Sequence, residues 1–145
     1  MEIQNGFAPI TEKVVSSLEQ SIGLKLPNDY KRFILRHNGG YPSPNKFIFK
    51  DFRGKQSDSL VDYFLPIGDE FDNNVGMVYG YFTGEERLPI GILPVAYDPF
   101  GNMICINLTD ENFGSLYFWD HELEYLDTNL SFVANNFEEF VDLLR

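Results

Sequence analysis

Two neighbouring stretches near the N-terminus carry apolar residues at the spacing of an amphipathic helix. The first lies between Thr11, whose hydroxyl can cap free amides, and Gly23, which can end a helix in the left-handed conformation. Within this stretch the buried stripe is predicted to be Val14, Val15, Leu18 and Ile22.

The second stretch begins at Pro27, whose fixed φ suits the first helical position, and Asp29 places negative charge on the first turn. Residues 38–40, Asn-Gly-Gly, tolerate positive φ, so we expect this helix to end by about residue 38. The two helices should form a hairpin whose apolar faces need a sheet to cover. The apolar face of the second helix is predicted to be Tyr30, Phe33, Ile34 and His37.

The pattern then changes to that of β-strands. Residues 47–52 are aromatic and β-branched and predict one strand, residues 53–59 read as a polar turn, and residues 60–67 predict a second strand that pairs with the first. Further on, residues 94–97, 103–108 and 115–119 predict a three-stranded meander whose first turn is Asp98 to Asn102. Together they predict one antiparallel sheet of about five or six strands.

Two more helices are expected. Residues 75–82 have helical spacing, although Gly76 and Gly80 weaken it, and Asn136 followed by Glu139 is a version of the capping box that opens a C-terminal helix. A chain of 145 residues is the size of one domain. We therefore predict a single α+β domain over residues 1–145, with the N-terminal helical hairpin and the C-terminal helix packed on the sheet.

The composition of the chain indicates whether it folds and where in the cell it acts. A total of 23 aromatic residues, 16% of the chain, argues for a folded globule with an aromatic core. A lone cysteine, a start unlike a signal peptide and the lack of an apolar run of about 20 residues predict a cytoplasmic protein with no membrane partner.

The formal net charge is −11 and is unevenly distributed along the sequence. Residues 1–55 hold nine cations and five acids, whereas residues 56–145 hold two cations and 17 acids. Because nucleic-acid binding depends on Lys and Arg neutralising phosphates, no nucleic-acid partner is expected. A basic partner would be attracted, although acidic surfaces also keep ordinary proteins soluble.

Side chains with catalytic or ligating chemistry are few. Cys105 has no cation within several residues, which favours a buried structural role, and His37 is expected to make a hydrogen bond at its helix end. Asp120, His121 and Glu122, followed by Glu124, carry the ligand types of a metal or acid–base site. Neighbouring residues at a strand end point in different directions, however, which favours a charged strand end.

No phosphate-binding loop, dinucleotide fingerprint, cysteine pair or nucleophile elbow occurs in the sequence. We therefore predict a protein that is not an enzyme, with no catalytic residue, no metal and no cofactor. A binding role needs only a rigid scaffold with exposed charge and aromatic anchors. In β-strand 115–119, either Tyr117 and Trp119 or Leu116 and Phe118 should face outward. The candidate partner-binding residues are Asp69, Glu70, Asp72, Glu85, Glu86, Tyr117, Trp119, Asp120, Glu122 and Glu124.

Several of these stretches together resemble the SUKH superfamily, named for a yeast cell-wall regulator and a bacterial cell-proliferation protein. The order and spacing fit from about Ile10 to the C-terminus, although Pro99 and Phe100 stand where the family more often has glycine and other small residues. The matching motifs are Leu-Pro-x-Asp-Tyr at 26–30, Lys-x-Phe-Ile at 31–34, Asn-Gly-Gly-Tyr at 38–41, residues 93–96 leading through Asp98 to 101–102, and residues 104–106, 116–122 and 136–141.

Bacterial members of that family are mostly immunity proteins that bind and neutralise a cognate toxin. The resemblance therefore implies a protein toxin as partner, and the acidic surface favours a nuclease or another basic enzyme as the target. The alternative is a non-catalytic scaffold or regulatory module for an endogenous partner, as eukaryotic members imply. The sequence leaves the toxin and the oligomeric state open.

Overall fold

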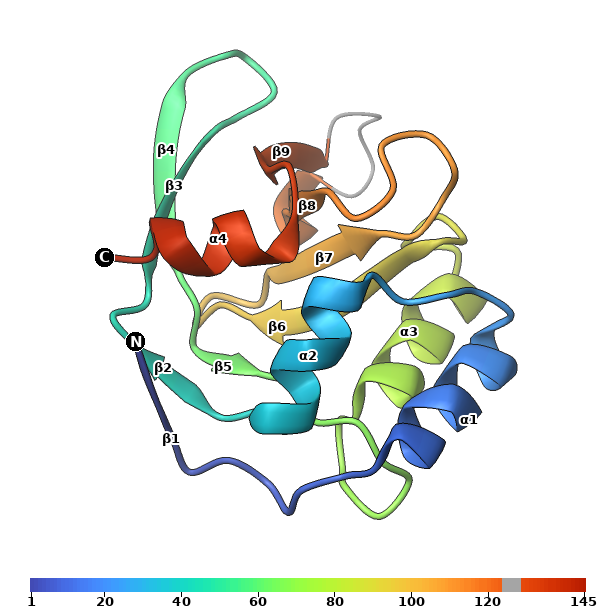
Figure 1. Cartoon of the computed structure of the whole chain (residues 1–145). Coiled ribbons are helices and arrows are strands. Elements are labelled where there is room, and N and C mark those ends of the chain that lie inside the picture. Colours follow the sequence, from blue (N-terminus) through green and yellow to red (C-terminus); the bar gives the residue numbers. More distant parts are fainter. Residues whose placement is uncertain (124–128) are drawn as a thin grey trace.

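The computed structural model describes residues 1–123 and 129–145 (Figure 1). The helices are α1 (Glu12–Ile22), α2 (Asn28–Arg36), α3 (Val75–Gly84) and α4 (Phe137–Leu143), with a short 3-10 helix at His121–Leu123. The strands are β1 (Glu2–Gln4), β2 (Tyr41–Ser43), β3 (Lys46–Lys50), β4 (Gln56–Leu60), β5 (Tyr63–Phe64), β6 (Ile92–Tyr97), β7 (Met103–Asn107), β8 (Leu116–Trp119) and β9 (Leu130–Ala134).

The N-terminal helical hairpin forms as predicted. Gly23 ends α1 with φ of 74°, a conformation that glycine adopts without steric cost. Two details differ from expectation. Thr11 stands at the N-cap without a side-chain hydrogen bond, and Pro27 is the N-cap residue of α2 rather than its first helical residue. Tyr30 and Ile34 are buried, but His37 is exposed because α2 ends at Arg36 and His37 is already extended.

Asn38, directly after α2, connects three segments. Its side-chain amide donates to the carbonyls of Ala8 and Ile67, and its Oδ1 accepts from the Ile67 N–H at 2.8 Å. These bonds satisfy backbone N–H and C=O groups that are not paired within a β-sheet. The residue thus fixes the N-terminal segment and the segment leading to α3 against the end of α2.

The central sheet is antiparallel, with strand order β5-β6-β7-β8-β9. The predicted meander is confirmed as β6, β7 and β8, with Met103 opposite both Tyr97 and Trp119. The edge strand β9 was not predicted. It pairs with β8 so that Phe132 lies opposite Tyr117.

The prediction for the first hairpin was partly wrong. β3 pairs with β4, residues 56–60, which lie mostly in the segment read as a polar turn. Of residues 60–67, only Leu60 pairs with β3, opposite Lys46; the segment also contains β5, which joins the central sheet by pairing with β6. β4 has no strand signal in the sequence, because only Ser59 of this strand is buried and no apolar alternation marks it.

The central sheet is covered on both faces. Phe118 of β8 contacts Phe47 and Phe49 of β3, whereas the next residue, Trp119, contacts Phe82 of α3. Since successive residues of a strand point to opposite faces, the β3–β4 hairpin and α3 lie on opposite faces. Aromatic contacts from Phe47 to Phe140 of α4, and from Phe137 of α4 to Phe33 of α2, place α2 and α4 on the hairpin side (Figure 1).

The C-terminal helix begins as predicted. Asn136 is the N-cap residue of α4 and its Oδ1 accepts from the Glu139 N–H at 2.8 Å. The Glu139 carboxylate accepts from the N–H of Asn135, so two amides near the helix start are satisfied. Within residues 1–123 and 129–145, no helix is long and apolar enough to cross a bilayer.

Candidate functional site

The side of α3 that faces solvent lacks charge. α3 begins at Asn74, whose side chain caps the helix by accepting from the Met77 N–H, and it buries Val75, Val78 and Tyr79 against the sheet. On the opposite side Met77 is 53% exposed and Tyr81 is 56% exposed. Gly80 and Gly84 are exposed beside them. We call Met77, Gly80, Tyr81 and Gly84 the α3 surface.

The other helices of the N-terminal half follow the ordinary pattern. The exposed residues of α1 include Lys13 and Gln20, and those of α2 include Arg32 and Arg36. A surface helix typically places such polar side chains opposite its apolar stripe. α3 instead presents apolar side chains and glycines on both sides, which is typical of a helix that is covered on both sides.

Acidic residues stand at both ends of the α3 surface. Before the helix, the loop holds Asp69, Glu70 and Asp72; after it, Glu85 is the C-cap residue and Glu86 follows. All five are exposed, and within the described ranges none of them forms an ion pair. We call these five residues the acidic frame. Five of the predicted partner-binding residues are thus brought to the two ends of one helix.

The two glutamates at the C-terminal end oppose local stability. A helix C-terminus carries partial negative charge and prefers cations, so carboxylates there are unfavourable. Glu86 also has φ of 57°, a left-handed conformation that is costly for a residue with a Cβ atom. Features that weaken the local structure in this way are expected where function requires them.

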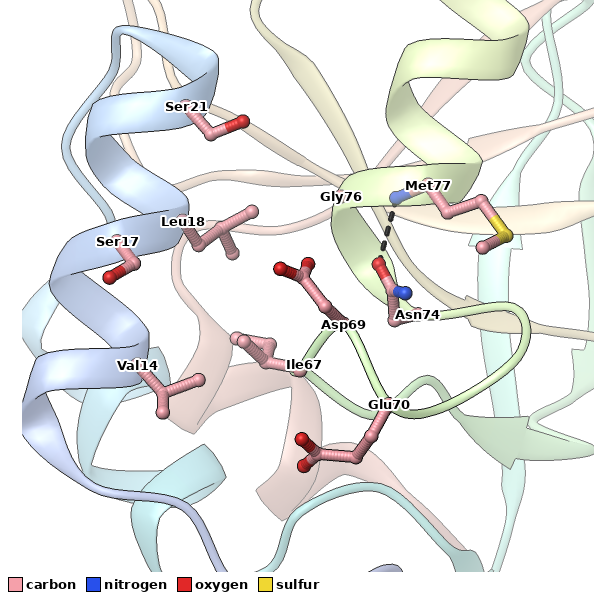
Figure 2. A pocket seen from close by; sticks show the side chains of 11 residues that line it. Val14, Ser17, Leu18, Ser21, Ile67, Asp69, Glu70, Asn74, Gly76 and Met77 are labelled. Carbon is pink, nitrogen blue, oxygen red and sulfur yellow. Dashed lines mark hydrogen bonds between the residues drawn. The ribbon is translucent and has the colours of Figure 1, made fainter.

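A pocket of about 410 Å³ opens between α1 and α3 at the N-terminal end of the α3 surface (Figure 2). Figure 2 shows the Asp69 carboxylate extending into the space between the two helices, with Leu18 of α1 beside it. Gly76 forms part of the α3 wall, where a Cβ atom would lie 3.0 Å from Leu18. No lysine, arginine or histidine is among the described lining residues, which are Val14, Ser17, Leu18, Ser21, Ile67, Gly68, Asp69, Glu70, Asn74, Gly76 and Met77.

Most of the cations lie away from α3. Seven of the 11 are on α2, on β3 or in the turn that follows β3: Lys31, Arg32, Arg36, Lys46, Lys50, Arg53 and Lys55. Acids lie among them, including Asp58 on β4 and Glu138 and Asp142 on α4. Arg87 directly follows the acidic frame, and its guanidinium lies over the rings of Phe82 and Trp119.

The two aromatic candidates of β8 have different environments. Trp119 is fully buried; its indole N–H donates to the carbonyl of Arg87, whose guanidinium lies over the ring. Tyr117 is partly exposed and contacts Phe132 of β9. Because the sheet is covered on both faces, Leu116 and Phe118 are buried as well, and Trp119 offers no exposed ring to a partner.

The Asp120-His121-Glu122 segment belongs to a hydrogen-bond network that starts at Asp98. The Asp98 Oδ1 accepts from the N–H groups of Phe100 and Asn102, and Oδ2 accepts from the Ser59 hydroxyl and the Asn102 side-chain amide. The Asn102 Oδ1 in turn accepts from the His121 N–H and lies 2.6 Å from its Nδ1, which therefore carries the proton. The network fixes the 98–102 turn against β4 and the end of β8.

In that segment, Asp120 is partly exposed and Glu122 is exposed. Glu124, predicted with them, lies outside the described residues. Asp120 lines a cleft of about 360 Å³ between the β3–β4 hairpin and the β6–β7 turn. Within the described ranges, no cluster of three or more histidine, cysteine, aspartate or glutamate side chains could hold a metal ion.

The expected role of Cys105 is confirmed. The thiol is fully buried in β7, and this burial raises its pKa above the usual range, so the reactive thiolate is disfavoured. Met77 and Tyr81 were missed by the sequence analysis. A signal was available: residues 75–84 contain no charged residue, which an amphipathic surface helix would be expected to have.

Comparison with known proteins gives a consistent family. A model of the SMI1/KNR4 family (SUKH-1) matches residues 9–143. Two curated proteins of Bacillus subtilis (strain 168) align over most of the chain. An SPbeta prophage-derived uncharacterized protein, YokK, is 32% identical over 90% of this chain and 72% of its own length. Immunity protein YxxD is 24% identical over 97% of this chain and 91% of its own length.

Proposed function

We propose, because the chain belongs to the SMI1/KNR4 family (SUKH-1), that it is an immunity protein that binds and neutralises a cognate bacterial toxin. The name of the relative YxxD, an immunity protein, supports this function. The proposed target is a basic enzyme such as a nuclease, delivered into the cytoplasm where this protein would act.

The observation that carries the proposal is the acidic frame at the two ends of α3. Its five carboxylates are exposed, and within the described ranges none of them forms an ion pair. Negative potential of this kind orients an approaching basic protein toward α3 and speeds association, to about 10⁸ M⁻¹s⁻¹ or more at low salt.

Neutralisation would then follow from occlusion. A nuclease holds its substrate with Lys and Arg groups that contact phosphates. Carboxylates on a rigid scaffold can bind the same Lys and Arg groups of the nuclease and so exclude the nucleic acid. This mechanism needs no catalytic residue or cofactor in the immunity protein, and the buried thiol and the structural network around His121 are in keeping with it.

The residues proposed to face the toxin fall into two sets. The first is the acidic frame at the ends of α3. The second is Asp120 and Glu122 after the end of β8, with the partly exposed Tyr117 as an aromatic contact, and Glu124, which follows them in the sequence and lies outside the described residues. Trp119 is excluded from the second set because it is buried.

Co-expression tests the function. The toxin domain encoded by the neighbouring gene should arrest growth of a host cell when expressed alone, and this chain should restore growth. A catalytically inactive toxin domain should co-purify with the chain as a stoichiometric complex. Absence of both rescue and complex would overturn the immunity function and favour a scaffold for an endogenous partner.

A further inference from the structure

We infer that the α3 surface is where the toxin docks, and that its occupant is a segment with an apolar middle and a basic group near each end. This inference rests on the proposed function, because it names the contact surface of the same partner. It assigns the central contact to Met77, Gly80, Tyr81 and Gly84, none of which carries charge.

The apolar side chains of α3 are unusually exposed. Met77 and Tyr81 lie one turn apart and are each more than half exposed, and no charged side chain of the helix shields them. Apolar surface of this kind with a polar rim marks interaction sites. Tyrosine and methionine are also among the residues enriched in interfaces.

A partner can also approach the backbone of α3 closely. A Cβ atom built on Gly80 or Gly84 would have no neighbour within 4 Å, so the helix backbone is accessible between the two side chains. Gly76, one turn earlier, is by contrast occupied by Leu18 of α1. The glycine row is thus covered at one end by the fold itself and open over the rest of its length.

The charges of the acidic frame lie at the two ends of this surface. α3 has 10 residues, so its two ends, and the two halves of the acidic frame, are about 15 Å apart along the axis. A partner that satisfies both halves needs basic groups at a matching separation. Lysines or arginines about ten or eleven residues apart on one face of a helix meet that requirement.

The pocket between α1 and α3 identifies where one of these groups lies. The methylene stem of a lysine or arginine can pack on Leu18 and Met77, while its charged head reaches the Asp69 carboxylate (Figure 2). The hydroxyls of Ser17 and Ser21 line the same pocket and can accept further hydrogen bonds. The pocket therefore suits a cation on a long apolar stem.

The acidic frame disfavours the other occupants of an apolar helix face. If a second copy docked through α3, in either direction, acidic groups would oppose acidic groups at both ends of the contact. An anionic membrane surface would be repelled for the same reason. A basic protein segment is the occupant for which the apolar contact and the charges act together.

Substitution at Gly80 tests the docking surface without removing any native contact. Gly80→Trp places a ring on the open surface, and because tryptophan has a higher helix propensity than glycine, the fold should stay intact or become slightly more stable. Leu143→Trp is the matched control, because Leu143 is 46% exposed on α4. Circular dichroism and thermal unfolding would establish that both variants fold.

Binding is measured by titrating each variant with the catalytically inactive toxin domain of the neighbouring gene. We expect Gly80→Trp to weaken affinity at least 100-fold and Leu143→Trp to change it less than threefold. Asp69→Lys should weaken affinity at least tenfold, against less than threefold for Glu111→Lys, a charge reversal in the exposed loop after β7. Hydrogen exchange of the wild-type complex should show new protection over residues 75–84.

The outcomes separate the inference from the function on which it rests. If wild-type protein binds the toxin but Gly80→Trp and Asp69→Lys bind equally well, the docking surface is wrong and the immunity function stands. Protection confined to another surface, or a wild-type dimer that Gly80→Trp dissociates, overturns the docking surface as well. If wild-type protein does not bind, the proposed function fails and the inference fails with it.

Discussion

Met77 and Tyr81 lie four residues apart on α3, and both project from its uncharged solvent side, each more than half exposed. In a protein with a net charge of −11, this helix is an apolar strip between two acidic ends. We therefore expect the charges to affect mainly the association rate and the apolar anchors to affect mainly the dissociation rate.

Truncation of the apolar anchors should shorten the lifetime of the toxin complex. Loss of a well-packed aromatic anchor typically costs about 2 kcal/mol or more, and such losses appear mainly in the dissociation rate. We expect Met77→Ala with Tyr81→Ala to speed dissociation at least tenfold in surface plasmon resonance, with association changed less than threefold. An effect on association alone would contradict the assignment of the anchors.

Glu86 should show a conflict between stability and binding. Replacement with glycine relieves the left-handed conformation and removes a carboxylate from the helix C-terminus, which together are expected to stabilise the fold by about 1 kcal/mol. Chemical denaturation of Glu86→Gly measures this gain. Association with the toxin should be slower at low salt. A less stable variant, or one that binds faster, would show that Glu86 has a structural role instead.

Asp120 and Glu122 should act through long-range attraction. They lie in the second proposed set, outside the α3 surface. Salt screens the attraction between exposed charges beyond the Debye length, which is about 8 Å at physiological salt, so their effect should depend on salt. We expect Asp120→Lys with Glu122→Lys to slow association severalfold and to flatten its salt dependence, without changing dissociation. A large increase in the dissociation rate would instead place direct contact at the end of β8.

The buried Asp98 should be required for folding rather than binding. It accepts four hydrogen bonds, including one from Ser59 on the β3–β4 hairpin, and each buried donor left without an acceptor costs about 1–3 kcal/mol. We expect Asp98→Ala to lose at least about 3 kcal/mol in urea denaturation. The exposed Asp110→Ala is the control, expected within about 0.5 kcal/mol of wild type. Equal stability of both variants would contradict the network.

Much of the fold could be predicted from local patterns. The two N-terminal helices, α3, each strand of the meander and the Asn136 cap have a signal contained within about a dozen residues. The family resemblance carried by the same segments is confirmed. The short strands β1 and β2 and the edge strand β9 were missed. Their pairing partners lie elsewhere in the sequence, and few of their side chains are buried.

The exposure of individual side chains could be predicted less well. Alternation along β8 was expected to leave either Tyr117 and Trp119 or Leu116 and Phe118 outside. Instead, α3 covers Trp119 and the β3–β4 hairpin covers Phe118. The acids of the frame were recognised in sequence as separate groups. The predicted helix at 75–82 already separated Asp72 from Glu85, but only the fold shows that Met77 and Tyr81 between them are exposed.

The most direct test of the central claim is a titration of purified toxin activity with the purified chain. If the chain acts by occupying the toxin's surface, inhibition should be complete at a 1:1 ratio. Toxin recovered from the complex in denaturant and refolded should have its full activity and an unchanged mass. Inactivation by a small fraction of an equivalent, or recovered toxin with an altered mass, would show that the chain acts by catalysis and would contradict the account.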